Sequence, residues 1–435
     1  MDELTQKFFE TLLKSQFMPP VEMVPYQHGL IERLVRHARA QVPFYRDSGR
    51  LDVLLRRDGT IDWDRWDEVP LLTRREAQDN AEALYAETVP PECGDVITGY
   101  TAGSTGTPLH FRTNRMMAAA GSATVERALI WAGMPAQLTL AVLRNDRKGE
   151  AAYPNGIVYQ STIRGTRRLM HHLSLQTPVE DQARWLARIR PDVVMNYPGA
   201  LAVLAQNLPD DLATHRFKLA ICVGEVTTEQ DRAIIEKAFR CPVLDLYSGS
   251  EFGTVAAQDC RDGRLYITEE TMLVEFKEPD GFAVADRDLH ELIFTPFYNY
   301  AMPLIRYATG DFAVVDSGQP ADGRSLRRLT RVAGRERNVF MMPSGRRWWP
   351  NFQNKVLCDY LDYRQIQFAQ TAQDKIEIRY VSDRSEPIAD EPGLLAYLRA
   401  ATPEPMDIAM VRKATIATRA SGKYEYSVRE IAPKS

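Results

Sequence analysis

Apolar and polar residues repeat along the chain with two different periods. In the segment IERLVRHARAQVPFYRD, the residues Ile31, Leu34, Val35 and Ala38 are apolar at the i, i+3, i+4, i+7 spacing that places them on one face of a helix. Pro43 cannot continue a helix and is expected to stop this one. The first 70 residues are therefore predicted to be mainly helical, with a polar outer surface.

From about residue 94 onward, short β-rich runs alternate with stretches of helical period. The stretches 179–190 and 227–239 are predicted helices, and each lies between two runs with strand character. Such alternation is typical of parallel strands joined by crossover helices. The predicted strands are 138–143, 192–197, 218–224, 242–248 and 290–297.

The pattern changes again near Gly334. After it, 375–382 and 410–418 have strand character, and 393–401 has the period of a helix. The join at 332–347 is short and charged, as expected of a hinge. The expected fold class is α/β: a large N-terminal α/β domain over residues 1–335, followed on a hinge by a small, mobile α+β domain over residues 336–435.

Composition narrows the class of protein. Hydrophobic residues make up 44% and charged residues 26% of the chain, which is typical of a globular protein with a large core. The net charge of −4 argues against nucleic acid or an anionic membrane as a partner. The segment MDELTQKFFETLLKSQF lacks the basic and apolar regions of a signal peptide, and no long apolar stretch predicts a membrane span, so a cytoplasmic protein is expected. Five dispersed cysteines without CxxC spacing argue against disulfides and zinc.

The segment GYTAGSTGTPLHF, residues 99–111, is the strongest candidate for a binding loop. Glycines let backbone N–H groups approach an anion closely, and the interleaved Ser and Thr hydroxyls can donate to phosphate oxygens. The Walker and Rossmann patterns are both absent. The segment is therefore either a phosphate loop of another kind or an ordinary surface turn.

Further segments follow in a fixed order, and each places a functional group at the end of a predicted strand or in a turn. Tyr247 could present an aromatic face to adenine, Glu251 could bind the Mg²⁺ that spans phosphates, and Asp311 could accept hydrogen bonds from ribose hydroxyls. Arg335 lies at the domain junction and Lys423 follows a glycine near the C-terminus. Taken singly, each has a plain alternative as a turn residue or a solvated charge.

Taken together, these motifs resemble those of the adenylate-forming superfamily, and within it the phenylacetate–CoA ligase-like branch. TAGSTGTP is similar to the phosphate loop of that family, and YSGSEFG, RYATGD, GRERN and SGKYEY to its later motifs, the last being the catalytic-lysine motif. VPFYR, EVPLLTRREAQDN and YPGAL are similar to this branch in particular. The resemblance extends over nearly the whole chain.

The resemblance implies a role for each matching position, and makes residues 1–335 an adenylation domain. The catalytic residues would be Lys423, Glu251 and Thr105, with Glu251 also the ligand of the metal ion and Lys423 bridging the acid and the α-phosphate. The ATP phosphates would be held by Thr101, Gly103, Ser104, Thr105 and Gly106. The rest of the nucleotide would contact Gly224, Glu225, Tyr247, Ser250, Asp311 and Arg335. The acid pocket would be lined by Tyr100, Asn196, Tyr197, Gly199, Val223, Ser248 and Gly249.

The implied reaction is AMP-forming: a carboxylic acid attacks ATP to give an acyl adenylate and pyrophosphate, and the acyl group then passes to the thiol of CoA. ATP, Mg²⁺ and coenzyme A are the expected cofactors, and Tyr100 and Tyr197 favour an aromatic acid. The alternatives left open are transfer to a carrier protein or an amine, activation of another oxyacid such as nitrite for N–N bond formation, and a protein that binds ATP without turnover. A homodimer is compatible with this branch.

Several segments depart from the family pattern. Thr107 stands where a lysine is common in the loop, and Arg337 and Asn338 stand where two aspartates are usual in the hinge. The segment 139–175 is either a polar substrate pocket or an exposed charged loop, and we favour the loop; it holds Arg144, Arg147, Lys148, Tyr153, His171 and His172. The tryptophans of WWPN, 348–351, either contact a carrier protein or pack under the hinge.

Overall fold

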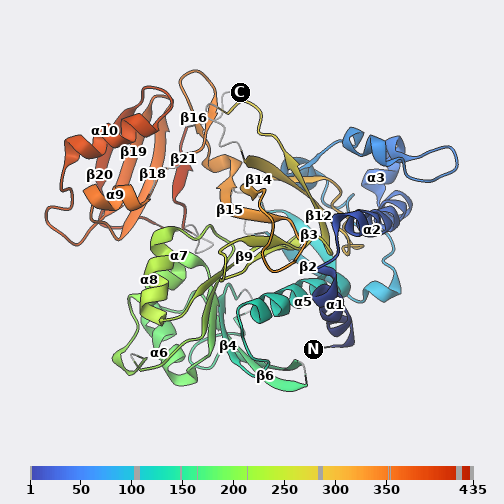
Figure 1. Cartoon of the computed structure of the whole chain (residues 1–435), viewed down its shortest axis with the longest axis horizontal. Coiled ribbons are helices and arrows are strands. Elements are labelled where there is room, and N and C mark those ends of the chain that lie inside the picture. The colour runs from blue at the N-terminus through green and yellow to red at the C-terminus, as the bar shows by residue number, and fades with distance from the viewer. Residues whose placement is uncertain are drawn as a thin grey trace.

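The computed structural model describes residues 2–101, 108–146, 149–163, 165–212, 214–282, 288–350, 352, 354–417 and 424–431. Figure 1 shows a large body with the N-terminal helices on one side, and a smaller body, formed by the last part of the chain, next to its green helices. Within the described residues, no helix combines the length and the apolar character that crossing a bilayer requires.

The N-terminal segment is helical, as predicted. Its helices are α1 (Glu3–Ser15), α2 (Pro20–Gln41), α3 (Pro43–Ser48) and α4 (Arg74–Asp79), with 3₁₀ turns η1 (Asp52–Leu54) and η2 (Trp63–Glu68). The predicted apolar face of α2 is buried in the main core. The helix is longer than its apolar pattern indicated, since it begins at Pro20 and contains Pro25. α2 ends just before Pro43, as predicted. Pro43 is also the first residue of α3, a position that proline fits well.

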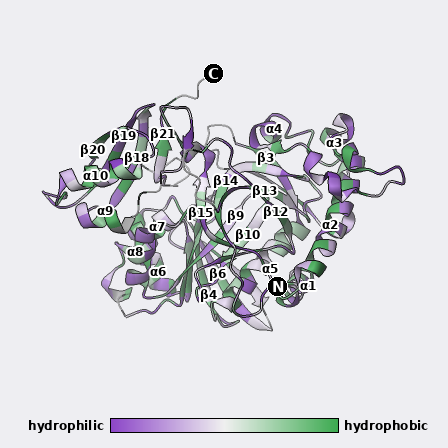
Figure 2. Ribbon diagram, turned by 45° about the horizontal axis from the view of Figure 1, so that its top comes forward, coloured by the Kyte–Doolittle hydropathy of each residue, from purple (hydrophilic) through white to green (hydrophobic). Residues whose placement is uncertain are grey.

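One half of the central sheet is parallel and buried on both faces. Its strands are β4 (Thr139–Arg144), β6 (Thr166–Ser174), β7 (Val193–Asn196), β8 (Leu219–Val223) and β9 (Val243–Gly249), in the order β9-β8-β7-β4-β6. Alternate residues of β4 pack toward opposite faces, which explains its continuous apolar run. One face is covered by α6 (Val179–Ile189), α7 (Pro198–Ala205) and α8 (Glu229–Phe239), and the other by α5 (Arg115–Trp131). Figure 2 shows hydrophilic and hydrophobic bands alternating along α6 and α8, as expected of helices with one buried face.

The other half of the sheet is antiparallel. It contains β10 (Gly253–Gln258), β11 (Leu265–Ile267), β12 (Met272–Lys277), β13 (Leu289–Pro296), β14 (Tyr307–Asp316) and β15 (Arg328–Arg335), in the order β12-β13-β14-β15-β11-β10. A short strand, β1 (Leu72–Thr73), pairs with β14. The strand predicted at 290–297 exists as β13, but its assignment to the parallel set is wrong, since β13 runs antiparallel to both β12 and β14. Among the described residues of this region no helix separates the strands, and an antiparallel pair needs none.

The polar segment 139–175 is not a loop throughout. Strand β5 (Ile157–Ile163) pairs antiparallel with β6 and forms the edge of the sheet, so the loop interpretation is wrong for this part. An edge strand pairs on one side only and tolerates exposed side chains. The sequence of β5 therefore lacks the apolar run by which the buried strands could be predicted. Val158 is 53% and Tyr159 46% exposed. Arg147 and Lys148 lie outside the described residues.

The last part of the chain forms a second sheet with its own core. Its elements are β16 (Phe340–Met341), β17 (Arg347–Trp348), α9 (Asn354–Tyr360), β18 (Gln365–Ala372), β19 (Lys375–Val381), α10 (Glu391–Ala401), β20 (Asp407–Arg412) and β21 (Ser427–Arg429). The four-stranded sheet has the order β20-β19-β18-β21. The strand predicted at 410–418 is shifted, because β20 pairs with β19 only as far as Arg412. This sheet and helix pair match the expected small α+β domain, and the boundary between residues 335 and 336 stays a prediction.

The two tryptophans after the hinge are packed rather than exposed. Trp348 lies in the core of the small domain. Trp349 packs against Phe312, and a Cβ added at Gly334 would lie 2.8 Å from its ring. Gly334 has φ +137°, a conformation that side chains rarely adopt. The hinge interpretation of WWPN is therefore the one that fits, and its tryptophans do not form an exposed docking surface.

Candidate active site

The glycine-rich segment lies between two paired strands. Strands β2 (Val96–Tyr100) and β3 (His110–Asn114) form an antiparallel hairpin. Thr101 closes the base of the loop: its N–H donates to the carbonyl of Leu109 at 2.9 Å, and its hydroxyl accepts from the N–H of Leu109 at 3.0 Å. The predicted phosphate ligands Gly103, Ser104, Thr105 and Gly106, and also Thr107, lie outside the described residues.

Gly99 precedes this loop and has a packing role. A Cβ at this position would come within 2.5 Å of the ring of Phe111 on the paired strand. The glycine therefore permits the hairpin to close over a buried phenylalanine, a role that does not require a phosphate.

The predicted metal ligand Glu251 is buried and is connected through Arg74 to Thr101, at the base of the loop. It is 3% exposed, and its Oε1 accepts from Arg74 Nη1 at 3.0 Å and from the Tyr307 hydroxyl at 3.4 Å. The same guanidinium donates from Nη2 to the hydroxyl of Thr101 at 2.9 Å. Burial raises the pKa of the Tyr307 phenol above its ordinary range, and the nearby charge of Glu251 adds to the effect. Arg74 thus joins the metal-ligand position to the phosphate-loop base.

Arg74 was not among the residues predicted for the site. It is the first residue of α4, directly after β1, whose pairing with β14 carries it to the sheet. Arg74 lies within the segment EVPLLTRREAQDN, which is similar to the family branch. The basic residues of that segment were the only sequence signal for a charged group at the site. Its function could not be inferred from the sequence, because the partner Glu251 is 177 positions away.

A second cluster forms where β9, β14 and β15 meet. The Tyr247 hydroxyl donates to Asp311 Oδ2 at 2.8 Å, and Arg335 Nε lies 3.0 Å from Asp311 Oδ1. Asp311 and Arg335 are paired residues of neighbouring strands, so the sheet register sets this contact. Burial raises the pKa of Tyr247 well above its ordinary range, with Asp311 contributing, and Asp311 raises the pKa of Arg335. A carboxylate has about four lone-pair positions, so Asp311 retains capacity to accept from further donors.

The residues predicted to line the acid pocket come mainly from the carboxyl ends of the parallel strands. Asn196 ends β7 and pairs with Cys222, directly before Val223 at the end of β8. Ligands of open α/β sheets bind at this edge. Ser248 and Gly249 end β9, where the ring of Phe252 leaves no room for a Cβ at Gly249.

Asn196 is the most buried of this group. It is 1% exposed, its Oδ1 accepts from the N–H of Tyr197 at 2.7 Å, and its Nδ2 has no hydrogen-bond partner in the part of the chain that the structure describes. Buried donors without partners are rare, which marks this one as a candidate contact for a ligand. Tyr100, in contrast, comes from the β2–β3 hairpin and is 43% exposed, and Ser250 is also exposed.

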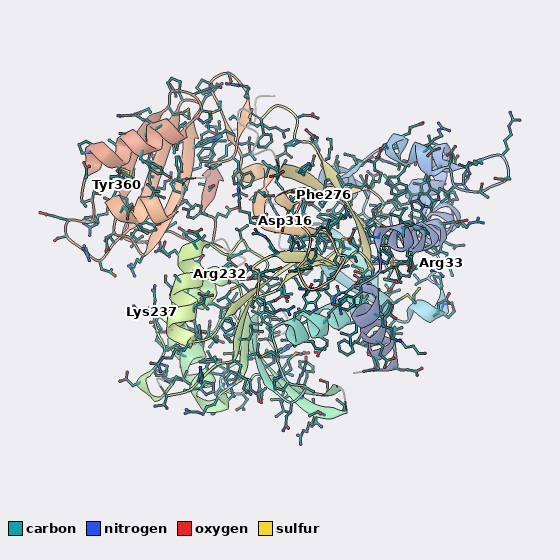
Figure 3. The ribbon with its side chains drawn as sticks, viewed as in Figure 1. Arg33, Arg232, Lys237, Phe276, Asp316 and Tyr360 are labelled. Carbon is teal, nitrogen blue, oxygen red and sulfur yellow. The ribbon has the colours of Figure 1, made fainter. Side chains whose placement is uncertain are left out.

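The loop after β8 is held in place by Asp245 on the neighbouring strand β9. Thr227 donates to Asp245 Oδ1 at 2.5 Å, and Arg232 donates to Asp245 Oδ2 at 2.7 Å. Figure 3 shows Arg232 on the inner side of α8 and Lys237 on its outer side. Burial raises the pKa of Asp245, against the opposing effect of Arg232. Asp245 lies on β9 two residues before Tyr247, so it ties the loop of Gly224 and Glu225 to the strand that carries the tyrosine.

Lys423 lies outside the described residues, but its neighbour Tyr424 contacts the large domain. The backbone N–H of Tyr424 donates to Glu225 Oε1 at 2.8 Å. The predicted nucleotide residue Glu225 therefore meets the segment that carries the predicted catalytic lysine.

Replacing Tyr247 by phenylalanine is expected to weaken ATP binding about fivefold, because one hydrogen bond to a charged group is lost while the ring remains. We expect the KM for ATP to rise and kcat to change little. Steady-state kinetics at varied ATP would check this, with Tyr266→Phe as the control, since that hydroxyl bonds Asp262 elsewhere in the molecule. A large fall in kcat at saturating ATP would contradict it.

The sequence is similar to that of known coenzyme A ligases. No protein-family model matches the sequence. The chain is 31% identical to the phenylacetate-coenzyme A ligase of Escherichia coli over 172 residues, a match that covers only 38% of that enzyme and 38% of this chain. It is 24% identical to the phenylacetate-coenzyme A ligase of Thermus thermophilus over 347 residues, 75% of this chain and 74% of the relative.

Solved structures share the fold across both domains. A 2-hydroxyisobutyryl-CoA ligase in its postadenylation state, in complex with an acyl-AMP, has a TM-score of 0.70 at 15% identity, covering 96% of this chain and 91% of its own. The same ligase in its thioesterification state has a TM-score of 0.56 at 16% identity, covering 96% and 92%. The arrangement of the two domains in this chain is therefore more similar to that of the postadenylation state. By sequence the chain is similar to phenylacetate-coenzyme A ligases, and it shares its fold with a 2-hydroxyisobutyryl-CoA ligase.

Proposed function

We propose that the protein is an AMP-forming ligase that activates a carboxylic acid with ATP and transfers the acyl group to the thiol of coenzyme A. The observation that carries the proposal is the Arg74–Glu251 ion pair at the base of the glycine-rich loop, with Glu251 buried and Arg74 partly buried. Charges removed from water are costly, and an ion pair next to a candidate phosphate loop has a clear use when a triphosphate and its cation bind there.

The residues around Glu251 fit a magnesium ion. Mg²⁺ is commonly bound by one or two carboxylates, with water and substrate phosphates completing the shell. Glu251 offers one carboxylate, and the described residues contain no group of three or more His, Cys, Asp or Glu that could form a cage without substrate. When bound, the ion would neutralise negative charge on the phosphates.

In the proposed first step, an oxygen of the acid forms a bond to the α-phosphorus of ATP while the bond from that phosphorus to the bridging oxygen breaks, so pyrophosphate leaves. Arg74 would place a positive charge near the phosphates, which offsets the repulsion between the anionic acid and the triphosphate. Asp311 and Arg335 would hold the ribose, and the face of Tyr247 would pack on adenine. In the second step, the CoA thiolate attacks the acyl carbon and AMP leaves.

We assign the acid to the aromatic class on the pocket-lining residues. Tyr197 supplies a flat surface, and the Asn196 Nδ2 donor would match an acceptor atom, such as a ring hydroxyl oxygen. A long acyl chain would leave this buried donor unsatisfied.

The test is pyrophosphate release from ATP and Mg²⁺ with benzoates, aminobenzoates, phenylacetates, cinnamates and nitrite, each with and without CoA, and products identified by mass. We expect a CoA-dependent acyl thioester with an aryl acid. An acyl adenylate that accumulates regardless of CoA would instead identify a carrier protein or an amine as the acceptor. Release only with nitrite and an amine would indicate N–N bond chemistry. ATP binding without release would overturn the proposal.

A homodimer also stays a prediction, which light scattering would check.

A further inference from the structure

Three segments from distant parts of the chain meet at the border between the two domains. They are the start of α7, the loop after β8 and the segment before β21. In Figure 1 the second sheet lies next to α7 and α8. At this border the Tyr424 N–H donates to Glu225 Oε1 at 2.8 Å, and Gln230 Nε2 donates to the carbonyl of Tyr363 at 2.9 Å.

Tyr424 is fixed within the small domain. Its hydroxyl donates to the carbonyl of Ile366 at 2.5 Å, and the following residue, Glu425, accepts from Gln367 Nε2 at 3.0 Å. Both partners lie on β18, so Tyr424 moves with the small sheet as one body. A hydrogen bond to the N–H of Tyr424 therefore acts on the orientation of the whole small domain.

Glu225 is fixed within the large domain on the loop that Asp245 holds. A Cβ added at Gly199 would lie 3.3 Å from the Cβ of Tyr424 and 3.6 Å from Glu225 Oε2. The carboxylate thus lies beside the first turn of α7, where the exposed N–H dipoles favour a negative charge. A side chain at position 199 would crowd the Cβ of Tyr424 and contact Glu225, so the helix, the carboxylate and Tyr424 are closely packed here.

We propose that Glu225 is a positioning residue that docks the small domain in the orientation used for adenylation. The proposal rests on the proposed function, because it assigns the docked orientation to the first half-reaction. Two further observations favour it. Tyr424 directly follows Lys423, the residue to which the family resemblance assigns that step, and the domain arrangement is more similar to the postadenylation state of a related fold than to its thioesterification state. Rotation of the small domain about the hinge would break the contact.

The first test is amide hydrogen exchange at Tyr424 in the ligand-free full-length protein. Glu225→Ala is expected to raise the exchange rate of this amide about tenfold, because a hydrogen bond to a charged acceptor is lost. Glu225→Gln keeps an acceptor oxygen and should show a smaller increase. Glu229→Ala, an exposed carboxylate at the start of α8, is the matched control and should show none. An unchanged exchange rate in Glu225→Ala would overturn the proposal, whether or not any acid is turned over.

The second test separates the two half-reactions. In Glu225→Ala, acid-dependent pyrophosphate release is expected to fall about tenfold, whereas conversion of added acyl adenylate and CoA to thioester is expected to fall by a smaller factor, because the docking contact serves only the first step. Equal loss of both would mean that Glu225 has only a structural role.

Gly199→Ala tests the same contact in a variant that is expected to fold, because alanine favours the helix while its Cβ crowds Tyr424. In a folded Gly199→Ala protein, the exchange rate of the Tyr424 amide should rise to a smaller degree than in Glu225→Ala, and an unchanged rate would contradict the docking contact. Failure of every acid in the wild-type protein would overturn the proposed function, but not the exchange result.

Discussion

Replacing Lys423 by alanine is expected to lower acid-dependent pyrophosphate exchange by about 10²–10³-fold, the usual cost of removing one group that stabilises developing charge. The reason is electrostatic: an anionic acid must approach a triphosphate, and the ammonium group would neutralise both at the reacting atoms. ATP binding should be nearly unchanged, because the predicted base and ribose ligands, Tyr247 and Asp311, lie on β9 and β14 of the large domain. Exchange of labelled pyrophosphate into ATP, together with calorimetry of ATP binding, measures both quantities.

Lys413→Ala is the matched control for this variant. Lys413 is exposed in the same small domain and directly follows β20, so its loss removes an equal charge from the same domain. It should leave exchange unchanged. Near-wild-type exchange in Lys423→Ala would remove the lysine from the mechanism, and equal losses in the two variants would point to a general charge effect.

Replacing Glu251 by glutamine is expected to lower kcat about 10²-fold and to raise the Mg²⁺ concentration needed for half-maximal rate. Glutamine retains the size and an acceptor oxygen for Arg74, so the fold should be kept. It removes the negative charge, which leaves the buried guanidinium uncompensated and a weaker ligand for the cation. The rate of pyrophosphate release at varied Mg²⁺ would check the expectation.

Glu236→Gln, on the exposed side of α8, serves as the control and should have no effect. Glu251→Asp should recover part of the rate, because it restores the charge at a shorter reach. If Glu251→Gln turned over slowly with an unchanged Mg²⁺ requirement, the carboxylate would act on the position of Arg74 and not on the metal ion.

The parallel half of the fold could be predicted well from the sequence. The predicted strands 138–143, 192–197, 218–224 and 242–248 correspond to β4, β7, β8 and β9, because strands buried on both faces form unbroken apolar runs. The edge strand β5 and the glutamine-rich β18 were missed, since their side chains have no such pattern. Their existence depends on partner strands that the local sequence does not reveal.

The candidate site shows the same limit. Motif resemblance identified Glu251, Asp311 and Tyr247, and the structure brings Asp311 and Tyr247 into direct contact. Arg74 and Asp245 could not be assigned functions, because each acts through a partner distant in sequence. The roles of the glycine-rich loop and of Lys423 stay predictions.

The change of strand direction at β9 divides the predicted site between two halves of the sheet. Asp311 and Arg335 belong to the antiparallel half, whereas Asn196 and Val223 end strands with one face packed under α6, α7 and α8, in a core that the antiparallel strands do not share. Substitutions that reshape the acid pocket can therefore accumulate beneath those helices without loosening the strands around Asp311. A protein divided in this way can change the ligand of one half during evolution and retain the ligand of the other.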